Sequence, residues 1–263
     1  MYKILIKFLG GLCCLFAYNA NAQNVQSWAV YYTDKASISE FEPFDLLVLD
    51  SDYHPALNRL VNRNKILYGY ISLGEVEHER FYFDAIKSEG ILLDENKNWP
   101  GSYFVDVRDP KWPKRVIEEI IPHILQKPFD GLFFDTLDNF AYLESKDPVK
   151  YKGMLEACIN LVKAIRRHYP DIKIMMNRAY EMLPKVSNII DAQLGESVYS
   201  GYDFANKTHQ QIAPTEYQWQ VMQLQNAKRI NPRLQIYTLD YWDMDDVAGI
   251  QKIYKIQRDN VFI

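Results

Sequence analysis

Short, almost wholly apolar runs alternate along this chain with segments of helical pattern, and this alternation constrains the fold more than any other feature. Eight such runs are rich in β-branched and aromatic residues. They are Trp28–Tyr32, Leu46–Asp50, Ile66–Ser72, Gly131–Asp135, Ile172–Asn177, Ala192–Glu196, Gln235–Leu239 and Asn260–Ile263. Strands whose two faces are both buried have this composition. Alternation of such strands with helices predicts parallel βα units.

The segments between these runs support one continuous domain over residues 23–263. Lys114–Leu125 and Lys150–Tyr169 have helical patterns, and Pro170 ends the second of them just before a strand. No low-complexity linker and no tandem repeat divides the chain. Eight strands in βα order predict a (β/α)₈ TIM barrel, with a doubly wound open sheet as the alternative. The eighth strand has the least support because no helix follows it, so the last unit is either abbreviated or continued in a longer chain.

The N-terminus has the three parts of a secretory signal. Lys3 and Lys7 precede an apolar run at 8–18, which leads into Ala-Asn-Ala at 20–22. We therefore expect residues 1–22 to be removed and the protein to be exported, to the periplasm or beyond. The apolar run is shorter than the roughly 20 residues that a spanning helix needs.

Cysteine content points to a fold held together by its core. Removal of the signal would take away Cys13 and Cys14, either of which is an alternative lipid-anchor position, and would leave only Cys158. One cysteine cannot form an internal disulfide. Cys158 lies in a helical run, so we expect a buried structural thiol.

Charge and composition exclude some functions. The net charge is −4 and the pI about 5.8, so the chain has no basic footprint for nucleic acid. A hydrophobic fraction of 48% and a charged fraction of 24% are those of an ordinary globular domain. We expect no cofactor, no metal, no stable membrane insertion after signal removal, and a monomer.

Polar residues collect where the predicted strands end. These ends carry Tyr32, Asp50, Tyr53, Ser72, Glu75, Asp135, Asp138, Asn177, Glu196, Asp240, Tyr241 and Trp242. In a (β/α)₈ barrel all the carboxyl ends of the strands open onto one face, where active sites are built. Acids far apart in the sequence are therefore expected to meet there.

Asp135 and Glu196 are the strongest candidates for catalysis. Each directly ends an apolar run that should form the barrel wall, where an unpaired carboxylate is costly to bury. Strand-end acids have a structural alternative, because Asp often caps the following helix. That alternative, or support of a neighbouring group, is favoured for Asp138, and for Glu75 binding and capping are equally good readings.

Two facing carboxylates are what glycosidic cleavage needs, one to donate a proton and one to remain ionised. Aromatic residues at the same rim are able to stack on sugars, although each one alone is more typical of core packing. They are Tyr31, Tyr53, Tyr70, Tyr199, Tyr241 and Trp242. Two other functions stay open: a metal-dependent polysaccharide deacetylase, disfavoured by five dispersed histidines, and a polysaccharide-binding module without catalysis.

Four motifs in order resemble glycoside hydrolase family 114, the endo-α-1,4-polygalactosaminidases. They start at Tyr70 (YISLGE), Val105 (VDVRDPKW), Phe129 (FDGLFFDTLD) and Glu196 (ESVY). The chain is also similar to the hydrolase domain of bacterial proteins that handle the Pel exopolysaccharide. The resemblance covers nearly all of the mature chain.

The resemblance implies a TIM barrel that cuts an α-1,4-linked, galactosamine-rich polymer internally and with retention. Asp135 would be the nucleophile and Glu196 the general acid/base. Acids such as Asp50, Glu75 and Asp138 would bind a cationic sugar. The full set of expected substrate-binding residues is Tyr32, Asp50, Tyr53, Tyr70, Ser72, Glu75, Asp138, Asn177, Tyr199, Asp240, Tyr241 and Trp242.

Overall fold

A curled parallel sheet of seven strands forms the centre of the molecule. The structure is a computed structural model, and it describes residues 27–263. The strands follow the order β1 (Trp28–Tyr31), β2 (Leu46–Asp50), β3 (Ile66–Ser72), β7 (Gly131–Asp135), β8 (Lys173–Asn177), β9 (Ala192–Glu196) and β12 (Gln235–Leu239). Every neighbouring pair is parallel. The α/β barrel-type sheet predicted from the apolar runs is confirmed for these seven strands. The expected signal at 1–22, with Cys13 and Cys14, lies outside the described residues.

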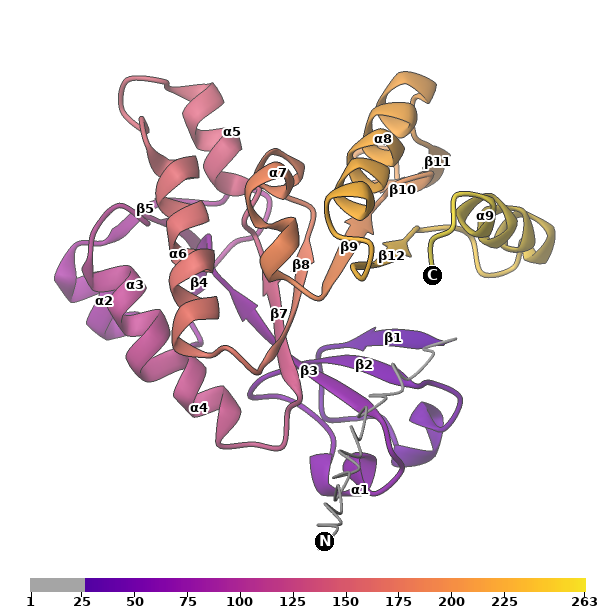
Figure 1. Cartoon of the computed structure of the whole chain (residues 1–263), viewed down its shortest axis with the longest axis horizontal. Helices are drawn as coiled ribbons and strands as arrows, with labels where there is room; N and C mark the ends of the chain where they lie inside the picture. The colour runs from indigo at the N-terminus through magenta and orange to yellow at the C-terminus, as the bar shows by residue number, and fades with distance from the viewer. Residues whose placement is uncertain (1–26) are drawn as a thin grey trace, which may run out of the picture.

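Helices lie on the outer side of the curl (Figure 1). They are α1 (Leu57–Val61), α2 (Phe83–Glu89), α3 (Lys111–Arg115), α4 (Ile121–Leu125), α5 (Asn139–Lys146), α6 (Met154–His168), α7 (Leu183–Val186), α8 (Pro214–Ile230) and α9 (Val247–Asp259). A π-helical turn at Val116–Ile120 joins α3 to α4. The two helical segments predicted from the pattern therefore correspond to α3–α4 and α6.

Two separate apolar clusters follow from the alternation of side chains along the strands. Leu46, Val48, Tyr68, Phe133 and Tyr237 are among the residues that fill the inside of the curl. A larger cluster lies between the outer face of the sheet and the helices. Residues that alternate along one strand thus enter different clusters, as a parallel sheet buried on both faces requires. Cys158 belongs to the outer cluster and is buried, which confirms the expected structural thiol.

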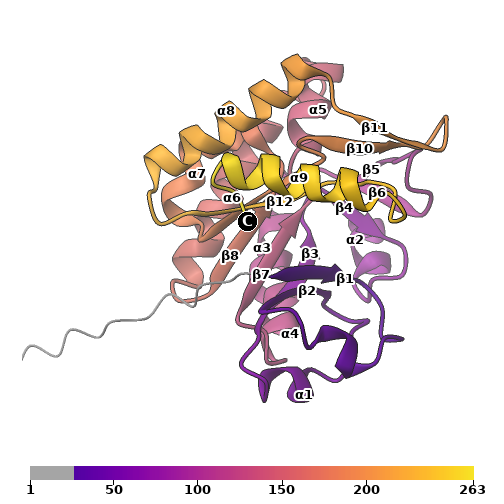
Figure 2. The same cartoon turned by 90° about the vertical axis from the view of Figure 1, so that its right-hand side faces the viewer.

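The predicted eighth strand, Asn260–Ile263, is wrong. Helix α9 continues to Asp259, and Val261 has a left-handed φ of 64° that a strand cannot contain. Only Ile263 pairs with β12, donating to Ile236 O at 2.9 Å and accepting from Thr238 N at 3.0 Å. Inside the curl, the rings of Trp28 (β1) and Tyr237 (β12) are in edge contact at 5.4 Å, so these two outermost strands meet through side chains. Figure 2 shows α9 beside this edge.

Two antiparallel insertions follow strands of the barrel sheet, and neither was predicted. After β3, the strands β4 (Glu75–Glu77), β5 (Leu92–Glu95) and β6 (Ser102–Val105) form a three-stranded sheet in the order β4-β6-β5. After β9, β10 (Ser200–Asp203) and β11 (Thr208–Gln211) form a hairpin. The sequence of β11 is Thr-His-Gln-Gln, which is fully exposed and has no apolar pattern to reveal it.

Candidate active site

Three adjacent strands end in the three residues at the centre of the candidate site. Strands β7, β8 and β9 end at Asp135, Asn177 and Glu196. The register of the sheet pairs Phe134 with Met176, one position before the first two of these ends. Because parallel strands present their carboxyl ends at one edge, the sheet delivers these three side chains to one place. The structure brings Asp135 and Glu196 together at this edge of the sheet, as expected.

One amide group connects the two carboxylates. Asn177 Nδ2 donates to Asp135 Oδ1 at 3.0 Å and to Glu196 Oε2 at 2.6 Å. These two oxygens are therefore no further apart than the two hydrogen bonds laid end to end. Asn177 is 4% exposed, and its Oδ1 is buried without a hydrogen-bond partner within residues 27–263. The amide acts as a fixed double donor between the acids.

The environment favours a proton on Asp135 more than water does. Burial raises the pKa of Asp135 to about 6, and the charge of Glu196 adds to this rise, while the hydrogen bond from Asn177 opposes it. Glu196 has a second donor, because Tyr241 Oη donates to its Oε1 at 2.5 Å. Burial and the charge of Glu196 raise the pKa of Tyr241, which keeps this phenol protonated and able to donate.

The backbone turns left-handed immediately after each of these three strands. The residues concerned are Thr136 (φ 63°), Arg178 (φ 49°) and Ser197 (φ 57°), and none of them is glycine. A left-handed residue with a Cβ costs about 1–2 kcal/mol. Such strain persists only where surrounding contacts impose it, and it concentrates at functional sites.

Contacts around Thr136 show how this conformation is held. Its hydroxyl accepts from Gly74 N at 2.8 Å and lies 2.8 Å from Ser72 Oγ. A Cβ on Gly74 would come within 2.1 Å of Thr136 O, so the close approach of these two loops requires glycine. Ser72 is an expected substrate-binding residue. Its hydroxyl is hydrogen-bonded to the Thr136 hydroxyl in this turn and donates to Glu75 O at 2.8 Å.

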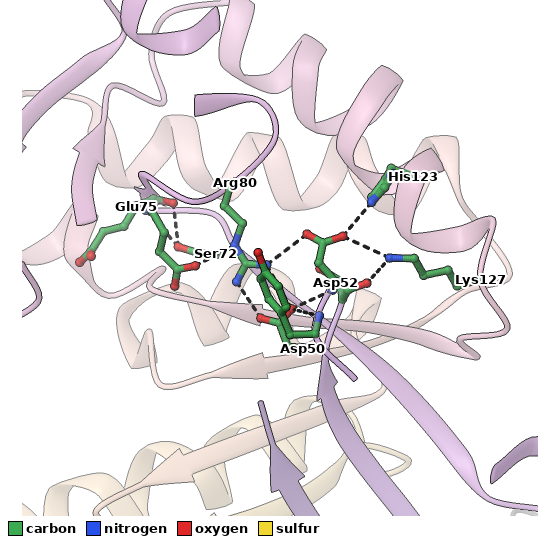
Figure 3. Close-up of polar contacts among 10 residues, drawn as sticks. Asp50, Asp52, Ser72, Glu75, Arg80, His123 and Lys127 are labelled. Carbon is green, nitrogen blue, oxygen red and sulfur yellow. Dashed lines mark hydrogen bonds and ion pairs between the residues drawn. The ribbon is translucent and has the colours of Figure 1, made fainter. Parts of the chain in front are cut away.

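Asp50 and Asp52 form a second acidic cluster, which is bound by cations of the protein itself (Figure 3). Arg80 donates to both oxygens of Asp50, at 2.8 and 3.3 Å, and to Asp52 at 3.3 Å. Asp52 also receives His123 Nε2 at 2.8 Å and Lys127 Nζ at 3.1 Å. The Arg80 side chain is only 8% exposed. Asp50, expected to bind substrate, is therefore already paired with a buried guanidinium.

Both carboxylate oxygens of Glu75 are likewise bound by donors from the protein. Its Oε1 accepts from Asn96 Nδ2 and from Asn139 Nδ2, both at 2.7 Å, and its Oε2 accepts from Ser102 Oγ at 2.5 Å. Glu75 is 4% exposed. These bonds join the β4-β6-β5 sheet to the start of α5, which makes Glu75 a structural tie between the insertion and the barrel.

Asp240 and Asp138 also have partners within the protein. Asp240 accepts from the backbone N–H groups of Tyr199 and Ser200 at 2.7 and 2.8 Å and from Gln257 at 2.6 Å. Asp138 occupies the N-cap position of α5 but makes no side-chain cap bond. It pairs instead with Arg178 Nε at 2.9 Å.

The expected aromatic residues fall into two groups. Tyr32, Tyr53 and Tyr241 are 43%, 51% and 39% exposed, and Tyr32 contacts the buried Tyr70 ring at 4.9 Å. Although the Tyr32 side chain is partly exposed, desolvation of its phenol and the charges of Asp135 and Glu196 raise the pKa of this group. The second group packs inside the protein.

Tyr31 and Tyr199 belong to that second group. The Tyr31 ring packs on Phe41, and its hydroxyl accepts from Ala36 N at 2.7 Å. Tyr199 is 8% exposed and contacts Tyr217 of α8. These contacts fit the packing role that the sequence favoured for each aromatic residue taken alone.

The sequence did not reveal the side chains that donate to the second cluster. Arg80 and Lys127 lie in loops and His123 in α4, with no motif that links them to Asp52. Across residues 27–263, no group of three or more His, Cys, Asp and Glu side chains is arranged to hold a metal ion. In the same part of the chain, no helix combines the length and apolarity needed to cross a membrane.

Comparison with known proteins gives a family match and two informative structures. The model of glycoside-hydrolase family GH114 matches residues 16–214. The glycoside hydrolase domain of PelA from Pseudomonas aeruginosa has a TM-score of 0.77 at 22% identity, covering 91% of this chain and 93% of that one. Aspergillus fumigatus Ega3, solved in complex with galactosamine, has a TM-score of 0.59 at 15% identity, covering 82% of this chain and 76% of that one.

A sequence relative extends this picture. An uncharacterised protein of Thermotoga maritima is 24% identical over 229 residues, which are 80% of this chain and 69% of that protein. At these identities the solved structures support the shared fold.

Proposed function

Because the chain belongs to glycoside hydrolase family GH114, we propose that it cleaves an α-1,4-linked, galactosamine-rich polysaccharide at internal bonds with retention of configuration. Asp135 serves as the nucleophile and Glu196 as the general acid/base. The observation that carries the proposal is the amide of Asn177, which binds one oxygen of each carboxylate.

The spacing of the two acids supports retention. Retaining glycosidases hold their carboxyl groups about 5–5.5 Å apart, whereas inverting enzymes need about 6.5–9.5 Å to admit a water molecule. Asp135 Oδ1 and Glu196 Oε2 accept hydrogen bonds of 3.0 and 2.6 Å from the same nitrogen of Asn177. The distance between these two oxygens is therefore shorter than the range for inverting enzymes. The acids are thus near enough to act on opposite sides of a single sugar bond.

The assignment of roles rests on protonation and on position. With a pKa of about 6, Asp135 is mostly ionised at neutral pH, as a nucleophile must be. Glu196 lies against the phenol of Tyr241, which can stabilise the carboxylate each time it has given up its proton. A raised pKa also suits a proton donor. The raised pKa would therefore also fit Asp135 as the general acid and Glu196 as the nucleophile, and an experiment has to distinguish the two assignments.

A cationic amino sugar fits the charge of the molecule. The chain carries a net charge of −4, and exposed tyrosines lie beside the carboxylate pair. Tyrosine rings combine an apolar face for the sugar with a polar group for its hydroxyls. The galactosamine bound to Ega3 provides a precedent on a similar fold. Export, expected from the N-terminal sequence, would bring the enzyme to such a polymer outside the cytoplasm.

The direct test is incubation with a panel of amino-sugar polymers, including polygalactosamine, galactosaminogalactan and Pel, followed by mass analysis of the products. Internal cleavage releases a ladder of oligosaccharides, and proton NMR of the first products shows an α anomer if configuration is retained. Binding to the polymers without any release of fragments would instead establish a non-catalytic module.

Azide separates the roles of the two acids. In the Glu196→Ala variant azide restores turnover as an α-glycosyl azide, because the intact nucleophile still forms a β-linked glycosyl-enzyme and azide then displaces Asp135 from the opposite face. In Asp135→Ala azide takes the place of the missing nucleophile and attacks the α-linked substrate directly, so the product is the β-glycosyl azide. Exchange of these two outcomes would reverse the assignment.

A further inference from the structure

A continuous row of aromatic rings extends away from the carboxylate pair, across segments that the barrel sheet does not need. We define the aromatic strip as Trp99, Phe204, Tyr202, His209 and Trp242. Consecutive ring centroids along this order lie 6.4, 5.1, 5.1 and 6.4 Å apart. Trp99 lies in the loop between β5 and β6, the next three in the β10–β11 hairpin, and Trp242 in the loop after β12.

The far end of the strip is unusually open to solvent. Trp99 is 62% exposed and Phe204 is 74% exposed, although both are large apolar side chains. Their rings touch at 6.4 Å while coming from insertions more than one hundred positions apart in the sequence. Figure 2 shows the two insertions on the same side of the molecule. Contiguous exposed aromatic surface of this kind marks an interaction site more often than chance placement.

Hydrogen bonds hold the turns that carry these rings. Asp203 accepts from the backbone N–H groups of Ala205 and Asn206, at 2.9 and 3.1 Å, and so closes the turn that presents Phe204. Trp99 N donates to Asn96 O, and Trp99 O accepts from Ser102 N, each at 3.0 Å. Rings held in this way lose little conformational freedom when a ligand binds.

The near end of the strip leads to the candidate active site. Trp242 Nε1 donates to Asp246 Oδ2 at 2.9 Å, which fixes the indole. The preceding residue, Tyr241, donates to Glu196. The loop Asp240–Asp246 contains four aspartates and no lysine or arginine. A ligand that follows the strip toward Glu196 therefore passes aromatic faces and then negative charge.

We propose that the aromatic strip is a distal binding track for a linear polymer of amino sugars, used by chain segments outside the bond being cut. This inference rests on the proposed function. Each ring-to-ring step is comparable with the length of one pyranose ring, and ring faces attract both apolar sugar faces and ammonium groups. The acidic loop beside Trp242 complements a cationic chain, which favours a polysaccharide over a second protein as the occupant.

The test compares long and short ligands in a background that cannot cleave them. Trp99→Ala, Phe204→Ala and the double variant are made in Asp135→Asn protein, and affinity is measured by calorimetry for long-chain polygalactosamine and for its trimer. Tyr254→Ala is the matched control, because Tyr254 is 59% exposed on α9 and outside the strip. The double variant should bind the long chain roughly tenfold more weakly. Its loss for the trimer should be several-fold smaller, and the control should bind both ligands like its parent.

The outcomes separate the two proposals. Long-chain affinity that survives in the double variant, an equal loss for polymer and trimer, or an equal loss in Tyr254→Ala would each overturn the track. Absence of any polymer binding by the parent would also overturn it. Failure of wild-type protein to release fragments, with long-chain binding still dependent on Trp99 and Phe204, would refute the hydrolase proposal and leave the track in place.

Discussion

The molecule contains two clusters of acids at strand ends, and they differ in how many protein partners their oxygens have. At the ends of β7 and β9, Asp135 receives one side-chain hydrogen bond and Glu196 two, counted within residues 27–263. At the end of β2, Asp50 alone receives two bonds from Arg80 and two from backbone N–H groups. Both clusters place carboxylates at or just after the carboxyl ends of parallel strands.

The difference shows that a carboxylate at a barrel mouth is not by itself a catalytic group. An acid saturated by donors stays ionised and contributes to stability, and it has little capacity left for substrate. An acid with few donors and a buried setting has a perturbed pKa and free lone pairs. Substitutions at Asp135 or Glu196 should therefore act mainly on catalysis, and loss of a partner of Asp50 mainly on stability.

The largest effect is expected on catalysis, from isosteric changes at the sparsely bonded cluster. Asp135→Asn and Glu196→Gln should each lower kcat at least 10³-fold, because each removes a group that acts on the reacting bond. Initial rates on a soluble polymer and thermal unfolding measure the two properties together. Wild-type turnover in both variants would contradict the assignment of this cluster as the active site.

Arg80→Met should have the largest effect on stability. Removal of the guanidinium leaves the buried Asp50 without its cation and takes one of several donors from Asp52, which costs about 3–5 kcal/mol. Urea denaturation measures the loss. Arg63→Met is the matched control, because the Arg63–Glu42 pair is exposed and should contribute less than about 1 kcal/mol. Equal losses in the free energy of unfolding of the two variants would mean that burial does not increase the contribution of the Arg80 ion pairs to stability.

Glu75 offers a pair of substitutions that distinguish a structural tie from a substrate ligand. Glu75→Ala leaves three donors without an acceptor and should cost about 2–3 kcal/mol. Glu75→Gln retains an acceptor for Asn96 and Asn139, so its free energy of unfolding should fall by about 1 kcal/mol or less. The glutamine variant should also keep its KM. A clear rise in KM in that folded variant would restore Glu75 as a substrate-binding residue.

The pKa of Asp135 predicts a pH dependence with a definite sign. Its pKa of about 6 in the folded protein exceeds the unfolded value of 3.8, so the folded state binds the extra proton between these values. This group therefore favours folding most below pH 4, and about 3 kcal/mol of that contribution is lost as the pH rises through 6. Urea denaturation of wild type and Asp135→Asn at pH 4 and pH 7 measures this contribution. The free energy of unfolding of wild type should fall relative to that of Asp135→Asn between pH 4 and pH 7.

The pH dependence of kcat/KM should report the same ionisation of Asp135. If Asp135 is the nucleophile, kcat/KM falls as the pH drops below about 6, because the protonated acid cannot attack. An acid limb near pH 4 would mean that Asp135 titrates like an exposed carboxylate.

The smallest effect is expected from backbone strain. Ser197→Gly should stabilise the protein by up to about 1 kcal/mol, since glycine adopts a φ of 57° without cost. Arg59→Gly in the regular helix α1 is the contrasting change and should destabilise by about 1 kcal/mol. Destabilisation by Ser197→Gly would show that side-chain contacts of Ser197 outweigh its strain.

The sequence was sufficient for the sheet and for the centre of the site. Apolar runs mark the seven strands because both of their faces are buried, and Asp135 and Glu196 stand out because each ends such a run. Family resemblance led to the same two residues. The β4-β6-β5 sheet and the β10–β11 hairpin escaped because they are short, partly polar and held by local pairing.

Partners of the second cluster could not be read from the sequence for a different reason. Arg80 lies 30 positions after Asp50, and His123 lies 71 positions after Asp52. Contacts between such distant side chains follow from the curl of the sheet and the path of loops, which have no periodic signal. The sequence therefore predicted Asp50, Glu75 and Asp240 as substrate-binding residues, although the folded chain supplies each of them with more donors than Asp135 has.

Asn177 has a consequence for how this site can change over evolutionary time. A single amide restrains both acids, so a substitution at any one of the three positions alters the setting of the other two, and their effects should not add. A descendant that lost one acid would keep little reason to retain the amide or the remaining acid. Divergent copies of this barrel are therefore expected to carry all three residues or to have replaced them together.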